Sequence, residues 1–347
     1  MGKDSTNIPA IYQLANYNFT IPEELIAKEP VEPRDQARLL VYYRKTKKIQ
    51  HHYFYQLPDL LGPEIALVAN TSKVFLARTF AQKVEGNSEV EILFVRNRED
   101  SLWETLMRPG RRVHQGQHIR FVDGSEAELI SKDDGVCLLD WQQTNPEEFF
   151  QRFGQLPLPP YLAGSKATQG DYQTVYANQI GSSAAPTAGL HFTESLWRKL
   201  ANAHPCYEVC LHVGLGTFKP IQEADIRNHS IHEEYIELSG PTANALNAWK
   251  KAGKKICAIG TTSLRTLESC FRNNNFQPYH GTTSLYLYPG RQLQAVDMLI
   301  TNFHTSESTL LVLVASIVGL EELQRIYTEA VEQKYRFFSF GDAMMIV

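Results

Sequence analysis

Six short stretches with the residue pattern of β-strands follow one another between residues 74 and 141, and no convincing helix interrupts them. They cover residues 74–80, 90–95, 102–107, 118–122, 127–130 and 136–141. The turns between them carry pairs such as Pro109-Gly110, Asp123-Gly124 and Asp134-Gly135, which favour tight chain reversal. Short strands at close, regular spacing predict a small all-β barrel or sandwich.

The rest of the chain alternates strands with helices, which favours an α/β body with a mostly parallel sheet. We expect helices over residues 193–203, 242–252, 263–271 and 320–335 and an apolar helix that ends at 318, with strands over 208–213, 255–260, 285–288 and 298–301. A chain of 347 residues is too long for one simple core. We therefore expect a body made of residues 1–74 and 155–347, into which residues 75–154 insert the barrel-like domain and a linker.

Composition limits the partners and the compartment. The net charge of −4 gives no overall basic signature, so any nucleic acid would be held by local patches. The longest apolar stretch, residues 310–320, falls far short of the ~20 residues that cross a bilayer, so no membrane partner is expected. Five irregularly placed cysteines indicate a reducing, cytoplasmic location rather than a disulfide framework. We expect a monomer.

Four polar segments follow predicted strands or enter predicted helices: residues 186–191, 214–217, 260–265 and 301–304. In open parallel sheets, ligands bind at the carboxyl ends of the strands, so these segments predict one site. Arg265, one turn into its helix, has the fork geometry that binds a carboxylate. The alternative is that Thr261 and Thr262 only cap the helix and Arg265 forms a surface ion pair.

Metal binding is the main competing chemistry. His204, Cys206, Cys210 and His212 share one strand parity, and His229-x-x-His232 is followed by two glutamates. However, neither a Cys-x-x-Cys pair nor a His-Glu-x-x-His motif is present. We therefore favour no metal, and we keep a metal-dependent hydrolase built on His229 and His232 as an alternative.

Several longer segments resemble one enzyme family. Residues 184–193 (AAPTAGLHFT), 211–220 (LHVGLGTFKP), 258–269 (AIGTTSLRTLES), 301–311 and 335–346 are similar to the bacterial S-adenosylmethionine:tRNA ribosyltransferase-isomerases of queuosine biosynthesis. Residues 21–41, 156–161 and 172–177 resemble the opening and the middle of the same family. The similarity covers nearly the whole chain in order.

The resemblance implies a fold, a reaction and its partners. The fold would be an α/β body with an inserted small β-barrel. The enzyme would transfer and isomerise the ribosyl group of S-adenosylmethionine onto the 7-aminomethyl-7-deazaguanine base at the wobble position of a tRNA anticodon arm. The products would be epoxyqueuosine-tRNA, adenine and methionine. S-adenosylmethionine would be a consumed substrate, and no cofactor is implied.

The resemblance and this chemistry together give the candidate site residues. The sulfonium acidifies the ribose 5′-hydrogens and adenine must leave, so groups that move protons are needed. The candidates for these steps are His191, His212, His304 and Asp342. Arg265 would hold the methionine carboxylate, and the nucleoside would be bound by Thr187, Gly189, Gly214, Gly216, Thr217, Thr261, Thr262 and Asn302.

The chain also departs from the family pattern. Thr71 replaces an aspartate, Thr282 and Ser284 replace a tryptophan and an aspartate, and Thr305-Ser306 replaces Leu-Pro. These changes leave open a divergent family member with an altered substrate or lost activity. A tRNA-binding module without catalysis is a further alternative. Arg111, Arg112 and Arg120 of the insertion are candidates for phosphate contacts.

Overall fold

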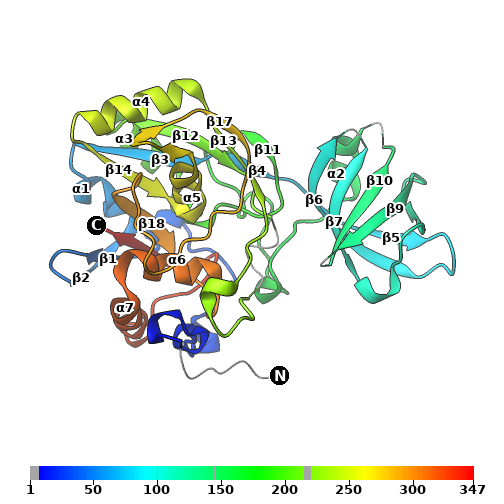
Figure 1. Ribbon diagram of the computed structural model, residues 1–347, viewed down its shortest axis with the longest axis horizontal. Helices are drawn as coiled ribbons and strands as arrows, with labels where there is room; N and C mark the ends of the chain where they lie inside the picture. The colour runs from blue at the N-terminus through cyan, green and yellow to red at the C-terminus, as the bar shows by residue number, and fades with distance from the viewer. Residues whose placement is uncertain (1–7, 100, 134, 144, 215–219) are drawn as a thin grey trace. The chain divides into compact units, whose positions relative to one another are not determined.

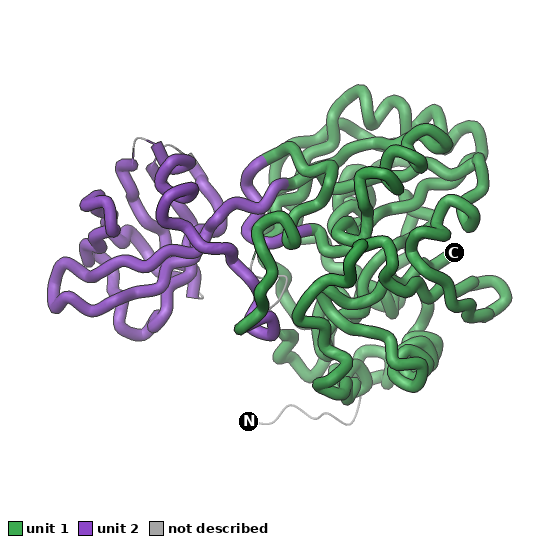
Figure 2. Tube along the Cα trace, turned by 180° about the vertical axis from the view of Figure 1, so that it is seen from behind, with its two compact units in different colours: residues 1–72, 164–179, 186–347 green, residues 73–163, 180–185 purple. Residues whose placement is uncertain are grey.

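The structure is a computed structural model that describes residues 8–347 except residues 100, 134, 144 and 215–219 (Figure 1). The chain forms two compact units (Figure 2). Unit 1 consists of residues 1–72, 164–179 and 186–347, and unit 2 consists of residues 73–163 and 180–185. Residues 75–154, expected as the inserted domain, all fall within unit 2.

A nine-stranded sheet forms the centre of unit 1, in the order β17-β13-β12-β3-β14-β18-β19-β1-β2. In chain order the strands are β1 (Arg38–Tyr43), β2 (Lys48–Tyr53), β3 (Ile65–Asn70), β12 (Cys206–Leu211), β13 (Glu234–Leu238), β14 (Lys255–Ile259), β17 (Tyr279–Thr283), β18 (Met298–Asn302) and β19 (Ala343–Ile346).

The sheet is mixed, so the expectation of a mostly parallel sheet is not confirmed. Strands β12, β3, β14 and β18 run parallel as a central block, and β1 is parallel to β19. The other neighbours are antiparallel. One cause is the short connection between β1 and β2, which permits only a hairpin. Another is the C-terminal strand β19, which enters the sheet between β18 and β1.

Alternate residues of the central strands share a buried cluster with α1 (Leu57–Leu60) and α3 (Glu194–Ala203). Cys257 and Ile259 of β14 belong to it, as do Leu196 and Leu200, which lie one turn apart on α3. The helix begins where the sequence predicts, because the Thr193 side chain accepts a hydrogen bond from the Leu196 amide at 3.2 Å.

Unit 1 also contains the helices α4 (Gly240–Lys251), α5 (Gly260–Cys270), α6 (Thr309–Val318) and α7 (Leu320–Glu332). Helix α5 packs on β3, β12, β14 and β18. It begins at Gly260, three residues before the predicted start, and Gly260 has a φ of 87° that other residues rarely adopt. Helix α6 begins after Ser308, whose side chain accepts from the Leu311 amide.

The strand predicted over residues 285–288 does not form, and the preceding strand β17 ends at Thr283. The Thr283 hydroxyl accepts a hydrogen bond from the Leu285 amide at 3.1 Å, which turns the chain out of the ladder.

Unit 2 contains a closed barrel of six strands in the order β10-β7-β6-β5-β8-β9, which confirms the predicted small β-barrel. The strands are β5 (Arg78–Lys83), β6 (Glu89–Glu99), β7 (Leu102–Arg108), β8 (His118–Phe121), β9 (Glu126–Asp133) and β10 (Val136–Trp141). Aromatic rings fill the interior, and those of Phe94 and Trp141 lie 4.9 Å apart. Helix α2 (Pro146–Phe153), which the sequence analysis missed, begins after an Asn145 cap.

The described residues also form two small two-stranded sheets. They pair β4 (Ser72–Val74) with β11 (Gln179–Ser182), and β15 (Phe271–Arg272) with β16 (Asn275–Phe276). No helix in the described part of the chain is long and apolar enough to cross a membrane.

Candidate functional site

Three of the four segments predicted to form a site follow parallel strands of the central block. Gly214 comes after β12, α5 comes directly after β14, and His304 comes after β18. Because β12, β3, β14 and β18 run parallel, their carboxyl ends share one edge of the sheet. The fold thus brings these segments to one edge. Gly216 and Thr217 lie outside the described residues.

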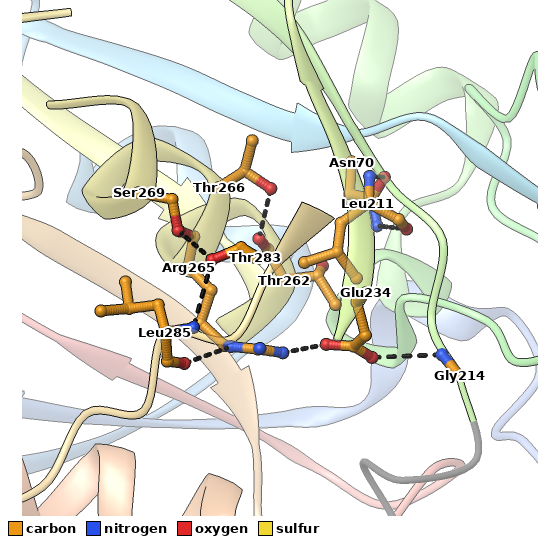
Figure 3. A network of polar contacts seen from close by, with 10 residues as sticks. All are labelled: Asn70, Leu211, Gly214, Glu234, Thr262, Arg265, Thr266, Ser269, Thr283 and Leu285. Atoms are coloured by element: carbon orange, nitrogen blue, oxygen red, sulfur yellow. Dashed lines mark hydrogen bonds and ion pairs between the residues drawn. The ribbon is translucent and has the colours of Figure 1, made fainter. Parts of the chain in front are cut away.

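A buried ion pair lies at this edge, between Arg265 of α5 and Glu234 of β13 (Figure 3). Their side chains are only 3% and 4% exposed. The second carboxylate oxygen of Glu234 accepts the Gly214 amide at 3.1 Å. The surface ion pair considered for Arg265 is therefore wrong, since its partner is buried with it. Glu234 links the helix after β14 to the segment after β12.

One nitrogen of the Arg265 guanidinium makes no hydrogen bond among the described residues. Its Nε donates to the carbonyl oxygen of Leu285 at 3.1 Å, and Nη1 binds Glu234. Its Nη2 is buried and has no hydrogen-bond partner among the described residues. An unsatisfied buried donor on a guanidinium is costly, and a carboxylate oxygen would satisfy it.

Hydroxyl groups hold the surroundings of Arg265 in place (Figure 3). Ser269 donates to the Arg265 carbonyl at 2.7 Å, and the Ser269 and Thr283 hydroxyls are also 2.7 Å apart. Thr262 is buried, and its hydroxyl has no partner among the described residues. The helix therefore presents a fixed guanidinium and a hydroxyl with unused hydrogen-bonding capacity.

His191 and Asn302 meet at the same edge. The 3-10 helix η9 (Thr187–His191) carries the histidine, and the Asn302 Nδ2 lies 3.2 Å from its Nε2. The same Nδ2 donates to the carbonyl oxygen of Phe338 at 3.1 Å. Because a carbonyl oxygen fixes the amide group as donor, the His191 Nε2 must accept, and the neutral ring carries its proton on Nδ1.

Burial keeps the His191 ring neutral. The side chain is almost fully enclosed, and burial together with the nearby charges of Arg336 and Arg34 lowers its pKa to about 3. The Asn302 Oδ1 is buried and has no partner among the described residues. A neutral imidazole and an open amide oxygen therefore lie side by side.

A cavity of about 380 Å³ lies near this histidine, next to Phe192. Arg34 lines it and donates to the Gln173 carbonyl oxygen at 2.9 Å. Glu32, Thr174 and Thr193 belong to the same lining, so the cavity is bordered by both an acidic and a basic residue and by polar side chains as well as apolar ones.

The other two candidate histidines differ in exposure. His304 is buried, its Nε2 lies 2.9 Å from the Thr301 hydroxyl, and burial lowers its pKa to about 3. His212 is half-buried, and its ring stacks on Tyr235 with centroids 5.3 Å apart. His212 is thus the most accessible of the three.

The Asp342 carboxylate binds backbone amides of two other segments. Its two carboxylate oxygens accept the amides of Arg38 at 2.8 Å and Arg336 at 2.7 Å. Burial raises its pKa. This arrangement fixes the starts of β1 and β19, and both oxygens of the proposed acid or base are already engaged.

Gly189 has a packing reason for lacking a side chain. A Cβ at this position would lie 2.7 Å from the Thr174 methyl group and would also overlap the Tyr176 hydroxyl. Thr187, at the start of the same 3-10 helix, is partly exposed. Thr261 lies within the first turn of α5.

The residues considered for a metal do not gather. His229 instead binds Glu223 through Nδ1 at 2.8 Å. Across the described ranges, no group of three or more His, Cys, Asp or Glu side chains is placed to hold a metal ion.

Sequence reasoning missed two polar residues of this edge. Asn70 ends β3, and its side chain exchanges two hydrogen bonds with the Leu211 backbone, at 2.9 and 3.0 Å. Glu234 was noticed only as a possible metal ligand. The sequence does hold a signal for Asn70, because this polar residue directly follows the apolar strand residues 65–69.

The departures from the family pattern take part in local structure. Thr71 pairs its amide with the Val209 carbonyl at 2.9 Å. Ser306 exchanges two hydrogen bonds with the Phe19 backbone, at 2.9 and 2.7 Å. Thr71 and Ser306 are therefore both hydrogen-bonded to neighbouring backbone.

Comparison with known proteins gives a consistent result. The chain matches the family described as queuosine biosynthesis protein over residues 14–346. It is 42% identical to the S-adenosylmethionine:tRNA ribosyltransferase-isomerase of Thermotoga petrophila over 96% of this chain and all of that protein. The enzyme of the same name from Carboxydothermus hydrogenoformans is 43% identical, with the same coverage.

A solved structure is also similar. The crystal structure of S-adenosylmethionine tRNA ribosyltransferase from Thermotoga maritima aligns with a TM-score of 0.56 and 35% identity. The alignment covers 96% of this chain and 100% of that one.

Proposed function

The chain belongs to the queuosine biosynthesis protein family, and we propose that it performs the reaction named for its relatives. It is an S-adenosylmethionine:tRNA ribosyltransferase-isomerase, which transfers and isomerises the ribosyl group of S-adenosylmethionine onto tRNA. The acceptor is the 7-aminomethyl-7-deazaguanine base, and the products are epoxyqueuosine-tRNA, adenine and methionine. The observation that carries this assignment is 42% identity along nearly the full length of both proteins.

The alternatives are less well supported. A metal-dependent hydrolase would need a ligand set, and His229 is engaged by Glu223 instead. A divergent member with lost activity is not favoured, since the buried polar network of Arg265 and Glu234 has an unused donor that suits a substrate group.

Arg265 binds the methionine carboxylate in this proposal. The supporting observation is its Nη2, a buried donor with no partner among the described residues. Glu234 fixes the guanidinium from the other side, so the fork is oriented before the substrate arrives. A charge-assisted hydrogen bond of this kind contributes about 1.5–3 kcal/mol.

His191 acts as a neutral hydrogen-bond donor to the departing adenine. Asn302 occupies its Nε2, which leaves the proton on Nδ1, and the low pKa keeps the ring uncharged at neutral pH. A neutral imidazole can stabilise developing negative charge without a full proton transfer. His212, which is the most accessible of the three candidate histidines, is assigned the removal of the ribose 5′-proton. His304 and Asp342 hold the neighbouring chain in position.

The remaining parts of the proposal concern setting and partners. The enzyme acts as a cytoplasmic monomer without a cofactor and recognises the anticodon arm of its tRNA.

The experiment is product analysis. The purified protein is incubated with S-adenosylmethionine and tRNA that carries the precursor base, and the digested tRNA is examined by mass spectrometry. Epoxyqueuosine is expected. Recovery of the unchanged precursor base would contradict the proposed function.

A further inference from the structure

Five cations gather around one turn of the barrel in unit 2. The 3-10 helix η7 (Gly110–Arg112) connects β7 to β8. The Lys83 Nζ donates to the Arg112 carbonyl oxygen at 2.5 Å, and the Lys132 Nζ donates to the Gly110 carbonyl oxygen at 2.7 Å. The two ammonium groups come from β5 and β9, so strands far apart in sequence converge on this turn. Arg108, at the end of β7, completes what we call the η7 cluster together with Arg111.

Among the side chains that the structure describes, no carboxylate is paired with the η7 cluster. None of its five members forms an ion pair among the described residues, and Arg108, Arg111 and Arg112 are exposed. Other arginines of the barrel behave differently. Arg98 pairs with Glu104, and Arg120 pairs with Glu126 at 2.8 Å.

The cluster is not a consequence of overall charge. Residues 73–163 contain 11 Lys and Arg against 14 Asp and Glu, so this segment is acidic as a whole. Glu91 faces Arg108 across the ladder, but its carboxylate binds Arg78 at 3.2 Å. A local excess of unpaired cations within an acidic segment requires like charges to be held together. The repulsion between these charges is unfavourable unless an anionic partner offsets it.

We propose that the η7 cluster binds the phosphate backbone of the tRNA substrate. Lysine ammonium groups supply point charges, and exposed arginines supply forks that match phosphate oxygens. The ammonium groups of Lys83 and Lys132 use only some of their N–H donors to bind the turn. These bonds hold the two charges beside Arg111 and Arg112. Contacts to phosphate position the RNA and carry no sequence information. The inference rests on the proposed function, which supplies the partner.

The test compares two double variants of the full-length protein. Arg111→Gln with Arg112→Gln removes two exposed cations of the cluster that make no side-chain hydrogen bonds in the structure described. Arg98→Gln with Arg152→Gln removes two exposed cations from the same unit that are already paired with glutamates, and it serves as the matched control. Binding of labelled tRNA is measured by fluorescence anisotropy at salt concentrations between about 50 and 200 mM.

The cluster variant is expected to bind tRNA about tenfold more weakly at low salt. The slope of log K against log salt concentration should fall by about 1.5, which corresponds to two lost phosphate contacts. The KM for S-adenosylmethionine should not change, since none of the residues proposed to bind that substrate belongs to the cluster. The control variant should retain wild-type affinity and slope.

Equal affinity and slope for the two variants would overturn the proposed surface. Failure of the proposed function has a different signature, because the wild-type protein would then release no adenine with precursor tRNA. Wild-type adenine release with unchanged tRNA binding by the cluster variant would overturn the surface alone. Weakened binding by that variant without any wild-type turnover would support the surface and contradict the activity.

Discussion

Glu234 and Arg265 form an ion pair that is almost completely removed from solvent, with side chains 4% and 3% exposed. The carboxylate also accepts the Gly214 amide, and the guanidinium keeps one buried donor unused. Burying two charges is favourable only when nearly all their hydrogen bonds are made. The pair therefore orients Arg265, and we propose that a substrate group makes the missing bond.

Glu234→Gln should destabilise the protein strongly. The substitution leaves the Arg265 charge buried without a counter-ion, which costs about 3–5 kcal/mol in the free energy of unfolding. Urea unfolding measures the loss. As a control, Arg98→Gln breaks an ion pair whose arginine is 55% exposed and should cost about 0–1 kcal/mol. Similar losses for the two variants would show that burial does not set the energy of the Glu234 pair.

Arg265→Lys should weaken binding of S-adenosylmethionine about tenfold or more, because an ammonium cannot reproduce the fork that faces both Glu234 and the carboxylate. The control is an analogue of S-adenosylmethionine that lacks the carboxylate. Wild type should bind this analogue more weakly than the substrate, and the variant should bind both equally. Calorimetry gives the four dissociation constants. A variant that still distinguishes the two ligands as wild type does would exclude Arg265 as the carboxylate site.

His191→Ala should lower the rate of adenine release about a hundredfold or more at saturating substrates, since it removes a hydrogen-bond donor from the leaving group. Single-turnover kinetics measure the rate. His280→Ala, at an exposed position on β17, should leave the rate unchanged. Adenine release at the wild-type rate from the His191 variant would rule out the proposed role.

Burial of His191 and His304 should make stability depend on pH. Burial lowers the pKa of His304 from 6.5 to about 3, so only the unfolded chain takes up this proton as the pH falls below 6.5. The stabilisation is complete above pH 6.5 and is lost towards pH 3. Between pH 7 and pH 5 each such histidine should contribute a loss of about 2 kcal/mol in the free energy of unfolding.

The measurement is urea unfolding at pH 7, 6 and 5. His304→Gln should reduce the total loss between pH 7 and pH 5 by about 2 kcal/mol. His280→Gln should keep the wild-type dependence. If His304→Gln retained the full pH dependence, the ring would not be the buried neutral group described above.

Local signals predicted much of the fold. The cap at Thr193, the apolar face of α3 and the Asp123-Gly124 turn of the barrel each depend on residues only a few positions apart. Strand direction does not depend on such local signals. The antiparallel placement of β19 beside β18 joins residues about 45 positions apart, and no local pattern specifies it.

The candidate site shows the same division. Glycines and histidines near strand ends indicated the edge where Arg265 and His191 now lie. Their partners could not be derived, because the Glu234 and Asn302 contacts join residues 31 and 111 positions away. The strand expected over residues 285–288 fails because of a contact that is also distant in sequence. The Thr283 hydroxyl turns the chain, and the Leu285 carbonyl oxygen accepts a hydrogen bond from the Arg265 Nε.

Adenine release coupled to tRNA modification tests the central claim most directly. The wild-type protein is mixed with S-adenosylmethionine and either tRNA carrying 7-aminomethyl-7-deazaguanine or the same tRNA with guanine at that position. Adenine, methionine and modified tRNA should appear in equal amounts with the first tRNA, and none should appear with the second. Adenine release that does not require the precursor base, or no release although that tRNA is bound, would contradict the assignment.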